Sequence, residues 1–557
     1  MNTENRGIRL CRILAIIACV GVGLKFIFVD LGCDSEYELV MGYRIATGDR
    51  LFFDMWEPHQ TSALFVALLI KVFIGLFKTT TGVVVFVHTC CFFIRAAISV
   101  FSYNTLKKYS SEFAFLSACL FFIITPKDSL VPDFANIAVS CSFLMALFLI
   151  RYLRGDGKIY LYASGLMVCF SAVAYPSTVL TVCVIVFVLI KRKAYKALVG
   201  VLTECAALGI GFVAFILWSA GGMENFLNTI DCILALEPSH TRAFGEKIAA
   251  YTLDAVLMVA VCFAVYFLFR LCSGLFKAKT KEFRRNFSVD FAVLSVLAFS
   301  FVSIVRVYSR NNYALVFVGI MMAGFYYCNR LNQEEQFVSR LGMVSSLACF
   351  ASTLLMTDLG VAGSMTFLFT GAAFALLPLL RHLEEKSVSL RKWVPFVLLA
   401  VFLLRGVYII RPMYLQIDPI YKIHQIVKDG PAKGIVSEYM GPYMQNVSFD
   451  EWGNYVKDGQ SIYIVGCTEK GLDTLGYLYM DTVIGAPSVM STPNYNETLK
   501  KYWEIHPDKY PDVVIASCWY GSLESTLASN EWFMNWIENE YCPSEVIDGN
   551  YWRYYIR

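Results

Sequence analysis

Long apolar segments alternate with short polar ones along the first 410 residues of this 557-residue chain. About 20 apolar residues, with a range of about 17–25, are enough to cross a bilayer as an α-helix. The segments that approach this length cover residues 12–29, 82–104, 113–126, 134–150, 159–175, 177–190, 198–218, 249–269, 289–305, 313–328, 342–357, 364–380 and 393–410. The pattern predicts an all-α polytopic membrane bundle of about thirteen transmembrane helices.

The pattern changes near residue 411, where charged and polar residues become frequent. The runs SIYIVG (461–466) and PDVVIAS (511–517) are typical of short buried strands. We predict a transmembrane module over residues 1–410 and a separate α/β domain over residues 411–557, which is long enough to have its own core. The aromatic and polar segment 486–512 of this domain is a candidate to face the membrane module.

Segment 61–77, TSALFVALLIKVFIGLF, is apolar but contains Lys71. The distribution of Lys and Arg decides its placement, because cytoplasmic loops of membrane proteins are enriched in these residues. If the segment does not cross, one set of connections holds the basic clusters at residues 6–12, 107–108, 151–158, 191–196, 270–285 and 381–392. We therefore predict an interfacial helix at 61–77, a cytoplasmic N-terminus, and an extracytoplasmic position for the first outer loop (30–81) and the C-terminal domain.

Composition narrows the class of protein. Hydrophobic residues make up 57% of the chain and charged residues only 16%, which excludes an ordinary soluble domain. Most of the 18 cysteines fall inside apolar runs, where free Cys behaves as a small hydrophobic residue, and their spacing indicates neither a disulfide framework nor a zinc site. The first apolar segment has no clear signal cleavage site after it, so we expect a retained helix.

The stretch from residue 30 to residue 60 has an unusual density of acidic side chains at the boundary of a membrane segment. It reads DLGCDSEYELVMGYRIATGDRLFFDMWEPHQ and contains Asp34, Glu36, Glu38, Asp49, Asp54 and Glu57. Ionisable groups next to a bilayer are costly and suggest a functional site. This stretch is therefore the first place to look for chemistry.

Within it, DSEYELVMGYRIATGDRLFFDMWEPHQTSALF resembles the first outer loop of the GT-C superfamily of membrane glycosyltransferases. The branch it resembles most closely contains the protein O-mannosyltransferases and the aminoarabinose transferases. The matching residues are Asp34 at the end of the first span, Tyr37 three positions on, Gly48, and Pro58 before the interfacial helix. The resemblance covers about 35 residues, with weaker matches to about residue 136, and beyond that it is one of architecture.

The resemblance implies transfer of a sugar from a polyprenyl-phosphate carrier to an acceptor on the outer face of the membrane, with inversion at the anomeric carbon. In such chemistry a carboxylate deprotonates the acceptor hydroxyl. Asp34 occupies the family's catalytic position. The family usually has an acidic residue directly after it, whereas here Ser35 is followed by Glu36, so both carboxylates are candidates for the base. The alternative is that Asp34 caps a helix over residues 35–47.

A second acidic position in the family lies at the start of the fourth span. Asp128 and Asp133 are the candidates here, and Asp133, directly before the apolar run, fits better; helix capping is the alternative. Cations and hydrogen-bond donors would bind the carrier phosphate. The candidate substrate-binding residues are Tyr37, His59, Lys127, His240, Arg242, Arg306 and Arg310, of which the last two alternatively snorkel at a helix end.

Glu57 stands where the family often has Lys before the Pro, which argues against phosphate contact there. No cofactor is expected, because the donor is already activated by its lipid phosphate; no metal-ligand motif is present in the sequence, which leaves open whether a divalent metal assists. The expected partners are the bilayer, the donor lipid and a glycan, lipid or protein acceptor, with no nucleic acid. The expected location is the plasma membrane of a bacterium.

Two other functions fit a membrane bundle. A transporter or flippase of lipid-linked oligosaccharides predicts discontinuous charged spans and a repeated half, and the sequence shows no repeat. A polymerase or ligase of surface polysaccharide shares the substrate class and usually carries its key groups in a late outer loop. Residues 219–247, with Glu237, His240 and Arg242, leave that alternative open.

Overall fold

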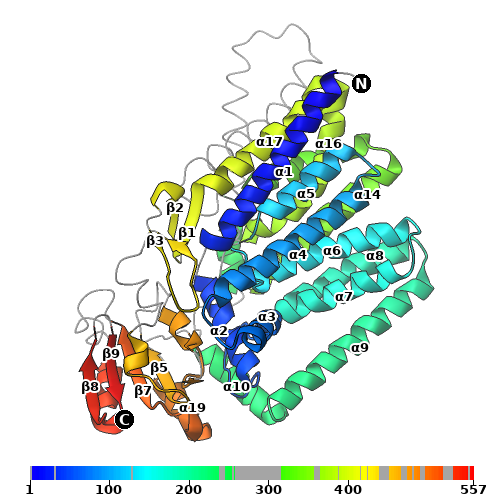
Figure 1. Ribbon diagram of the computed structural model, residues 1–557. Coiled ribbons are helices and arrows are strands. Elements are labelled where there is room, and N and C mark those ends of the chain that lie inside the picture. Colours follow the sequence, from blue (N-terminus) through cyan, green and yellow to red (C-terminus); the bar gives the residue numbers. More distant parts are fainter. Residues whose placement is uncertain are drawn as a thin grey trace.

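The computed structural model describes most of the chain. The described residues are 3–29, 33–126, 129–236, 245–253, 256, 315–356, 364–386, 388–413, 416–422, 425–437, 451–465, 473–479, 482–489, 496–517, 531–549 and 552–557. Most of them are helical, and a small sheet is formed near the C-terminus (Figure 1). The predicted combination of a helical bundle with a C-terminal strand region is therefore confirmed.

Helices form the first part of the chain. They are α1 (Thr3–Val29), α2 (Cys33–Thr47), α3 (Ala63–Phe77), α4 (Val83–Leu106), α5 (Ser111–Ile123), α6 (Phe134–Leu153), α7 (Ile159–Ala174), α8 (Val182–Lys191), α9 (Tyr195–Ser219), α10 (Met223–Leu236), α13 (Leu315–Tyr327), α14 (Gln333–Met356), α16 (Phe369–Lys386) and α17 (Val388–Tyr408). Within the described ranges, six segments are long and apolar enough to cross a membrane: Arg6–Val29, Val83–Leu106, Phe134–Leu153, Tyr195–Ser219, Gln333–Leu354 and Met365–Glu385.

Every expected span that falls on described residues is helical. α4, α6 and α9 begin and end within about three residues of the predicted segments, because their apolar composition stops there. α1 begins earlier, at Thr3, since the polar N-terminal residues continue the same helix. The segments 249–269 and 289–305 lie partly and wholly outside the described residues, so a total of thirteen spans remains a prediction.

Two cations inside apolar helices bind the ends of neighbouring helices. Arg95 in α4 donates to three carbonyl oxygens at the end of α5, those of Phe121, Phe122 and Ile124. Lys25 in α1 donates to the carbonyl oxygen of Gly406 in the last turn of α17 and to that of Ile409, the residue directly after the helix. The last carbonyls of a helix have no partner within it, so each cation satisfies acceptors that would otherwise be exposed to apolar surroundings.

Basic residues from connections with the same predicted orientation converge at one end of the bundle. Arg12, Arg154 and Arg381 donate to Ser111 Oγ at 3.1 Å, to the Thr105 carbonyl at 3.1 Å and to the Tyr109 carbonyl at 3.2 Å, all within residues 105–111 between α4 and α5. The N-terminus lies toward this end, and the C-terminal sheet lies at the opposite end (Figure 1). Three of the basic clusters used for the orientation therefore meet at one end of the bundle, and the orientation itself stays a prediction.

The C-terminal sheet has five strands in the order β6-β5-β7-β9-β8. The strands are β5 (Ser461–Val465), β6 (Val483–Ile484), β7 (Val513–Ser517), β8 (Glu545–Asp548) and β9 (Trp552–Ile556). β5 pairs in parallel with β6 and β7, whereas β9 is antiparallel to β7 and β8. The two runs predicted as strands are β5 and β7, and both are buried because they lie inside the sheet.

Short elements complete this region. They are the hairpin β1 (Ile409–Met413) and β2 (Gln416–Pro419), the pair β3 (Gln425–Ile426) and β4 (Val436–Ser437), and the helices α19 (Asn496–Ile505) and α21 (Glu531–Trp536). Aromatic side chains form the core beside the sheet, where the rings of Trp503 and Trp536 stack with centroids 4.9 Å apart. These residues belong to the same buried hydrophobic cluster as residues of the helical bundle, so the described part of the chain has a continuous core.

α2 and α3 pack against each other at the sheet end of the bundle. A Cβ added at Gly42 would lie 2.6 Å from Val66 Cγ1 and 3.1 Å from the Ala67 amide nitrogen, so this close approach requires glycine. α3 corresponds to the expected interfacial helix at 61–77, and in Figure 1 it is seen nearly end-on while the long helices run across the picture. It therefore crosses the direction of the long helices.

Candidate functional site

The start of α2 lies beside the segment that leads into α6. The Ser35 and Ser129 hydroxyl oxygens are 2.5 Å apart, and both side chains are buried. α2 begins at Cys33, so Asp34 lies in the first helical turn and not before it, although its side chain falls outside the described part of the structure. Glu36, the other candidate base, is completely buried. The two acidic segments singled out in the sequence thus lie next to each other.

Asp133 caps α6. Its Oδ1 accepts a hydrogen bond of 2.7 Å from the Asn136 amide, and the residue is completely buried. The Asn136 side chain in turn donates to the carbonyl oxygens of Ser129 and Val131, at 3.2 and 3.0 Å. Of the two roles considered for Asp133, capping is therefore present in the geometry, and it fixes the loop that contacts α2.

His59 connects the first loop to the same place. Its ring stacks on Phe134, the first residue of α6, with a centroid distance of 4.1 Å, and lies 6.0 Å from the ring of Tyr175. The planes differ by 14° and 15°, so the three rings are nearly parallel. The structure therefore brings together the start of α2, His59 and the start of α6, which come from three separate parts of the sequence.

Tyr37 contacts a carboxylate that the resemblance does not mark as functional. Its hydroxyl donates to Glu57 Oε2 at 2.8 Å. The same oxygen accepts from the Ser488 hydroxyl at 2.8 Å, and Glu57 Oε1 accepts from the Val489 amide at 2.5 Å. Burial raises the pKa of Glu57, while the Arg44 charge and these hydrogen bonds oppose the increase.

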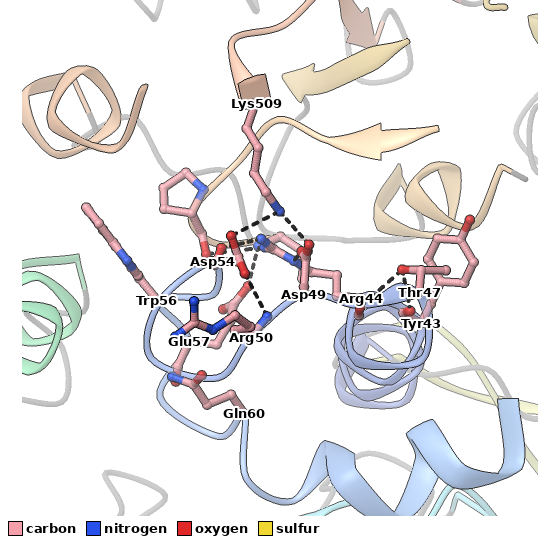
Figure 2. A network of polar contacts seen from close by, with 12 residues as sticks. Tyr43, Arg44, Thr47, Asp49, Arg50, Asp54, Trp56, Glu57, Gln60 and Lys509 are labelled. Atoms are coloured by element: carbon pink, nitrogen blue, oxygen red, sulfur yellow. Dashed lines mark hydrogen bonds and ion pairs between the residues drawn. The ribbon is translucent and has the colours of Figure 1, made fainter. Parts of the chain in front are cut away.

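A buried network of charges holds the rest of the loop against the C-terminal domain (Figure 2). Arg44 Nε donates to Asp49 Oδ2 at 2.7 Å, and Lys509 Nζ donates to Asp49 Oδ1 and lies 3.7 Å from Asp54 Oδ1. Burial by itself lowers the pKa of Arg44, but the neighbouring acidic groups, Asp49 first, raise it above its ordinary value. The φ of Gly48, 120°, ends α2 and allows Asp49 to turn back toward Arg44.

Aromatic and polar contacts surround this network. Tyr502 in α19 donates to the Asp54 carbonyl at 2.8 Å and packs edge-on against Trp56, whose amide donates to the Pro487 carbonyl at 2.9 Å. His506 lies 3.1 Å from the Phe53 carbonyl oxygen, and burial lowers its pKa. Segment 486–512, expected to face the membrane module, thus contacts the first loop at Pro487 and Tyr502.

The predicted site residues fall into two groups. Glu36, Tyr37, His59 and Asp133 are described and lie around the contact between α2 and α6, whereas Lys127, His240, Arg242, Arg306 and Arg310 lie outside the described residues. The sequence analysis missed Arg44, Ser488 and Lys509. Ser488 and Lys509 carry no local signal, because their side-chain partners Glu57 and Asp49 are 431 and 460 positions away. Arg44 pairs with Asp49 only five positions on, but its burial depends on the distant C-terminal domain.

Known proteins do not identify the site. Within the described ranges, no group of three or more His, Cys, Asp or Glu residues is arranged to hold a metal ion. The chain matches no protein-family model, and no curated protein matches it. The function is therefore inferred from the residues themselves.

Proposed function

We propose that this chain is a membrane glycosyltransferase of the GT-C type, which transfers a sugar from a polyprenyl-phosphate carrier to an acceptor at the membrane surface. The observation that carries the proposal is the contact of the acidic start of α2 with the Ser129–Asp133 loop, fixed by Ser35 and Ser129 at 2.5 Å. It places two separate acidic segments at one end of a helical bundle. A transferase that uses a lipid-linked donor needs its base near the membrane surface, which the end of a membrane bundle adjoins.

In this mechanism the carboxylate of Asp34, with Glu36 as the alternative, accepts the proton of the acceptor hydroxyl. The acceptor oxygen attacks the anomeric carbon from the side opposite the phosphate, and the polyprenyl phosphate leaves with the bonding electrons. Asp133 acts as a positioning residue, because it caps α6 and so fixes the loop that contacts α2. The phosphate-binding cations proposed from the sequence are Lys127, Arg242, Arg306 and Arg310, with His59 and His240 as further donors.

The orientation that accompanies this proposal has the N-terminus in the cytoplasm and the C-terminal domain outside the plasma membrane. Two observations support it. The N-terminus and the sheet lie at opposite ends of the bundle, and Arg12, Arg154 and Arg381 gather at the N-terminal end. Cytoplasmic connections are the ones enriched in Arg and Lys. The acceptor is then a cell-surface polysaccharide, a teichoic-acid-like polymer, a lipid or a protein.

The test is transfer of radiolabelled sugar from purified polyprenyl-phosphate sugars to membrane extract. We expect the unaltered protein to label an acceptor and Asp34→Asn to lower the rate at least about 100-fold, which is the lower end of the effect of losing a general base. Asp458→Asn, which removes an exposed carboxylate in the C-terminal domain, is the matched control and should keep full activity.

Two results would count against the proposal. If label crosses the bilayer without joining an acceptor, the protein is a transporter. If Asp34→Asn and Glu36→Gln are both as active as Asp458→Asn, neither carboxylate is the base and the resemblance of the first loop does not extend to its chemistry.

A further inference from the structure

A short segment of the C-terminal domain reaches into the first loop. Residues 487–489 follow β6, and all their contacts described above are with groups of the loop or of α2. The Val489 amide and the Ser488 hydroxyl both donate to Glu57, and the Pro487 carbonyl accepts from Trp56. Ser488, Val489 and Glu57 are buried, so these bonds are protected from water.

The same segment holds α2 at two points. At the first point, the Pro487 carbonyl accepts a hydrogen bond of 3.3 Å from Arg44 Nη1. The second contact is indirect: Ser488 and Tyr37 both donate to Glu57, which links the segment to Tyr37 of α2. Tyr37 and Arg44 are seven positions apart, close to two helical turns or about 10 Å, and so lie on one face of α2. Segment 487–489 therefore spans this face.

The second of these contacts, at Tyr37, adjoins the proposed base. Tyr37 follows Glu36 directly and lies three positions, nearly one turn, after Asp34. A hydrogen bond on Tyr37 thus restrains the turn of α2 that carries both candidate carboxylates. Losing it would let that turn shift, and a base must stay within hydrogen-bond reach of the acceptor to work.

We propose that segment 487–489 of the C-terminal domain positions the start of α2, and that Glu57 is the positioning residue through which it acts. The C-terminal domain is then a clamp on the first loop. Its effect on transfer rests on the proposed function, whereas its effect on α2 does not. This gives Glu57 a role that differs from the phosphate contact made by the family's Lys.

The test uses the full-length protein in detergent or nanodiscs and removes single hydroxyl groups. Ser488→Ala and Tyr37→Phe each delete one hydrogen bond to Glu57 Oε2, whereas Ser544→Ala deletes an exposed bond to the Ile556 carbonyl and is the control. Hydrogen exchange of the α2 amides is measured first. Hydrogen bonds to a charged acceptor are the stronger ones, so we expect about tenfold faster exchange in the first two variants and no change in the control.

Transfer kinetics give the second readout. We expect each of the two variants to lower kcat about tenfold, and Ser488→Ala to leave KM unchanged, because the misplaced group is then the base and Ser488 is not a donor-binding residue. The fall in kcat of the double variant should be smaller than the product of the two single falls, since both bonds end on one carboxylate oxygen. Glu57→Gln, which keeps the shape but not the charge, should resemble the double variant.

The outcomes separate this inference from the proposed function. If α2 exchange in Ser488→Ala and Tyr37→Phe equals that in Ser544→Ala, the clamp does not exist and the inference is overturned. If α2 loosens but an active enzyme keeps its kcat, the positioning role is overturned. If the unaltered protein transfers no sugar, the proposed function fails, and exchange at α2 alone decides whether the domain holds the helix.

Discussion

Lys509 offers the sharpest test of how the C-terminal domain is attached. Its side chain is only 6% exposed, and its ammonium binds Asp49 and lies 3.7 Å from Asp54. Lys509→Met keeps most of the volume and removes the charge, which leaves two carboxylates with fewer cations. Breaking a buried ion pair in this way costs about 3–5 kcal/mol.

The low end of this range applies here. Asp49 retains Arg44, and the side chains of Asp49 and Asp54 are 18% and 13% exposed, so water still reaches them. The free energy that holds the loop on the domain should fall by about 3 kcal/mol. Since about 1.4 kcal/mol corresponds to a factor of ten, separation of the loop from the domain becomes about 100-fold more frequent. Amides of residues 48–60, including that of Trp56, which bonds across the contact, should exchange faster by that factor.

Lys500→Met is the matched control, because Lys500 pairs with Glu540 with 41% and 44% of the two side chains exposed. Exposed pairs contribute about 0.2–1 kcal/mol, so exchange should rise at most about fivefold. Adding Asp54→Asn to Lys509→Met should recover part of the loss, since Asp49 keeps its ion pair with Arg44 and the substitution removes the charge of Asp54, which has lost its pairing with Lys509. If Lys509→Met behaves like Lys500→Met, the buried network does not hold the two parts together and the reasoning from burial is wrong.

Two further predictions concern packing and pH. Gly42→Ala should lower the free energy of unfolding by about 1–3 kcal/mol, seen as a lower melting temperature in detergent, because the new Cβ meets Val66 and the Ala67 backbone. The Cβ of Gly75→Ala meets nothing within 4 Å, so this control should keep the stability of the unaltered protein. His506 has a pKa below its ordinary 6.5, mainly because of burial, with Asp54 opposing. As pH falls below about 6.5 the undocked form binds a proton that the docked form excludes, so the protection of the loop amides, corrected for the intrinsic pH dependence of exchange, should fall in acid. His506→Asn should remove this fall, and protection that stays constant with pH in the unaltered protein would refute the prediction.

The helices and strands were predictable where a local pattern determines them. α4 and α6 follow from uninterrupted apolar runs, and β5 and β7 follow from short β-branched runs in a polar region. Lys25 and Arg95 stand within the predicted spans 12–29 and 82–104, but their partners could not be predicted, because a backbone carbonyl at a helix end leaves no mark in the sequence.

The candidate site was predictable in part for the same reason. The acidic stretch was evident from its composition, and Asp133 was recognised with both of its possible roles. The roles of Asp49, Asp54 and Glu57 in holding the C-terminal domain were not, since their partners in that domain lie more than 400 positions away in the sequence. Pairing over such a separation depends on the fold, and a single sequence does not encode it in any local pattern.

The separation of Asp49 from Lys509, 460 positions, also sets an order of events during synthesis. At about 5–20 residues per second, Lys509 is made roughly 20–90 s after Asp49. During that interval Asp49 has Arg44 as its cation, but the loop lacks the groups of the C-terminal domain that later cover it. Docking of that domain onto the loop therefore follows the synthesis of Lys509, and a chain that ends before Lys509 carries the acidic loop without this cover.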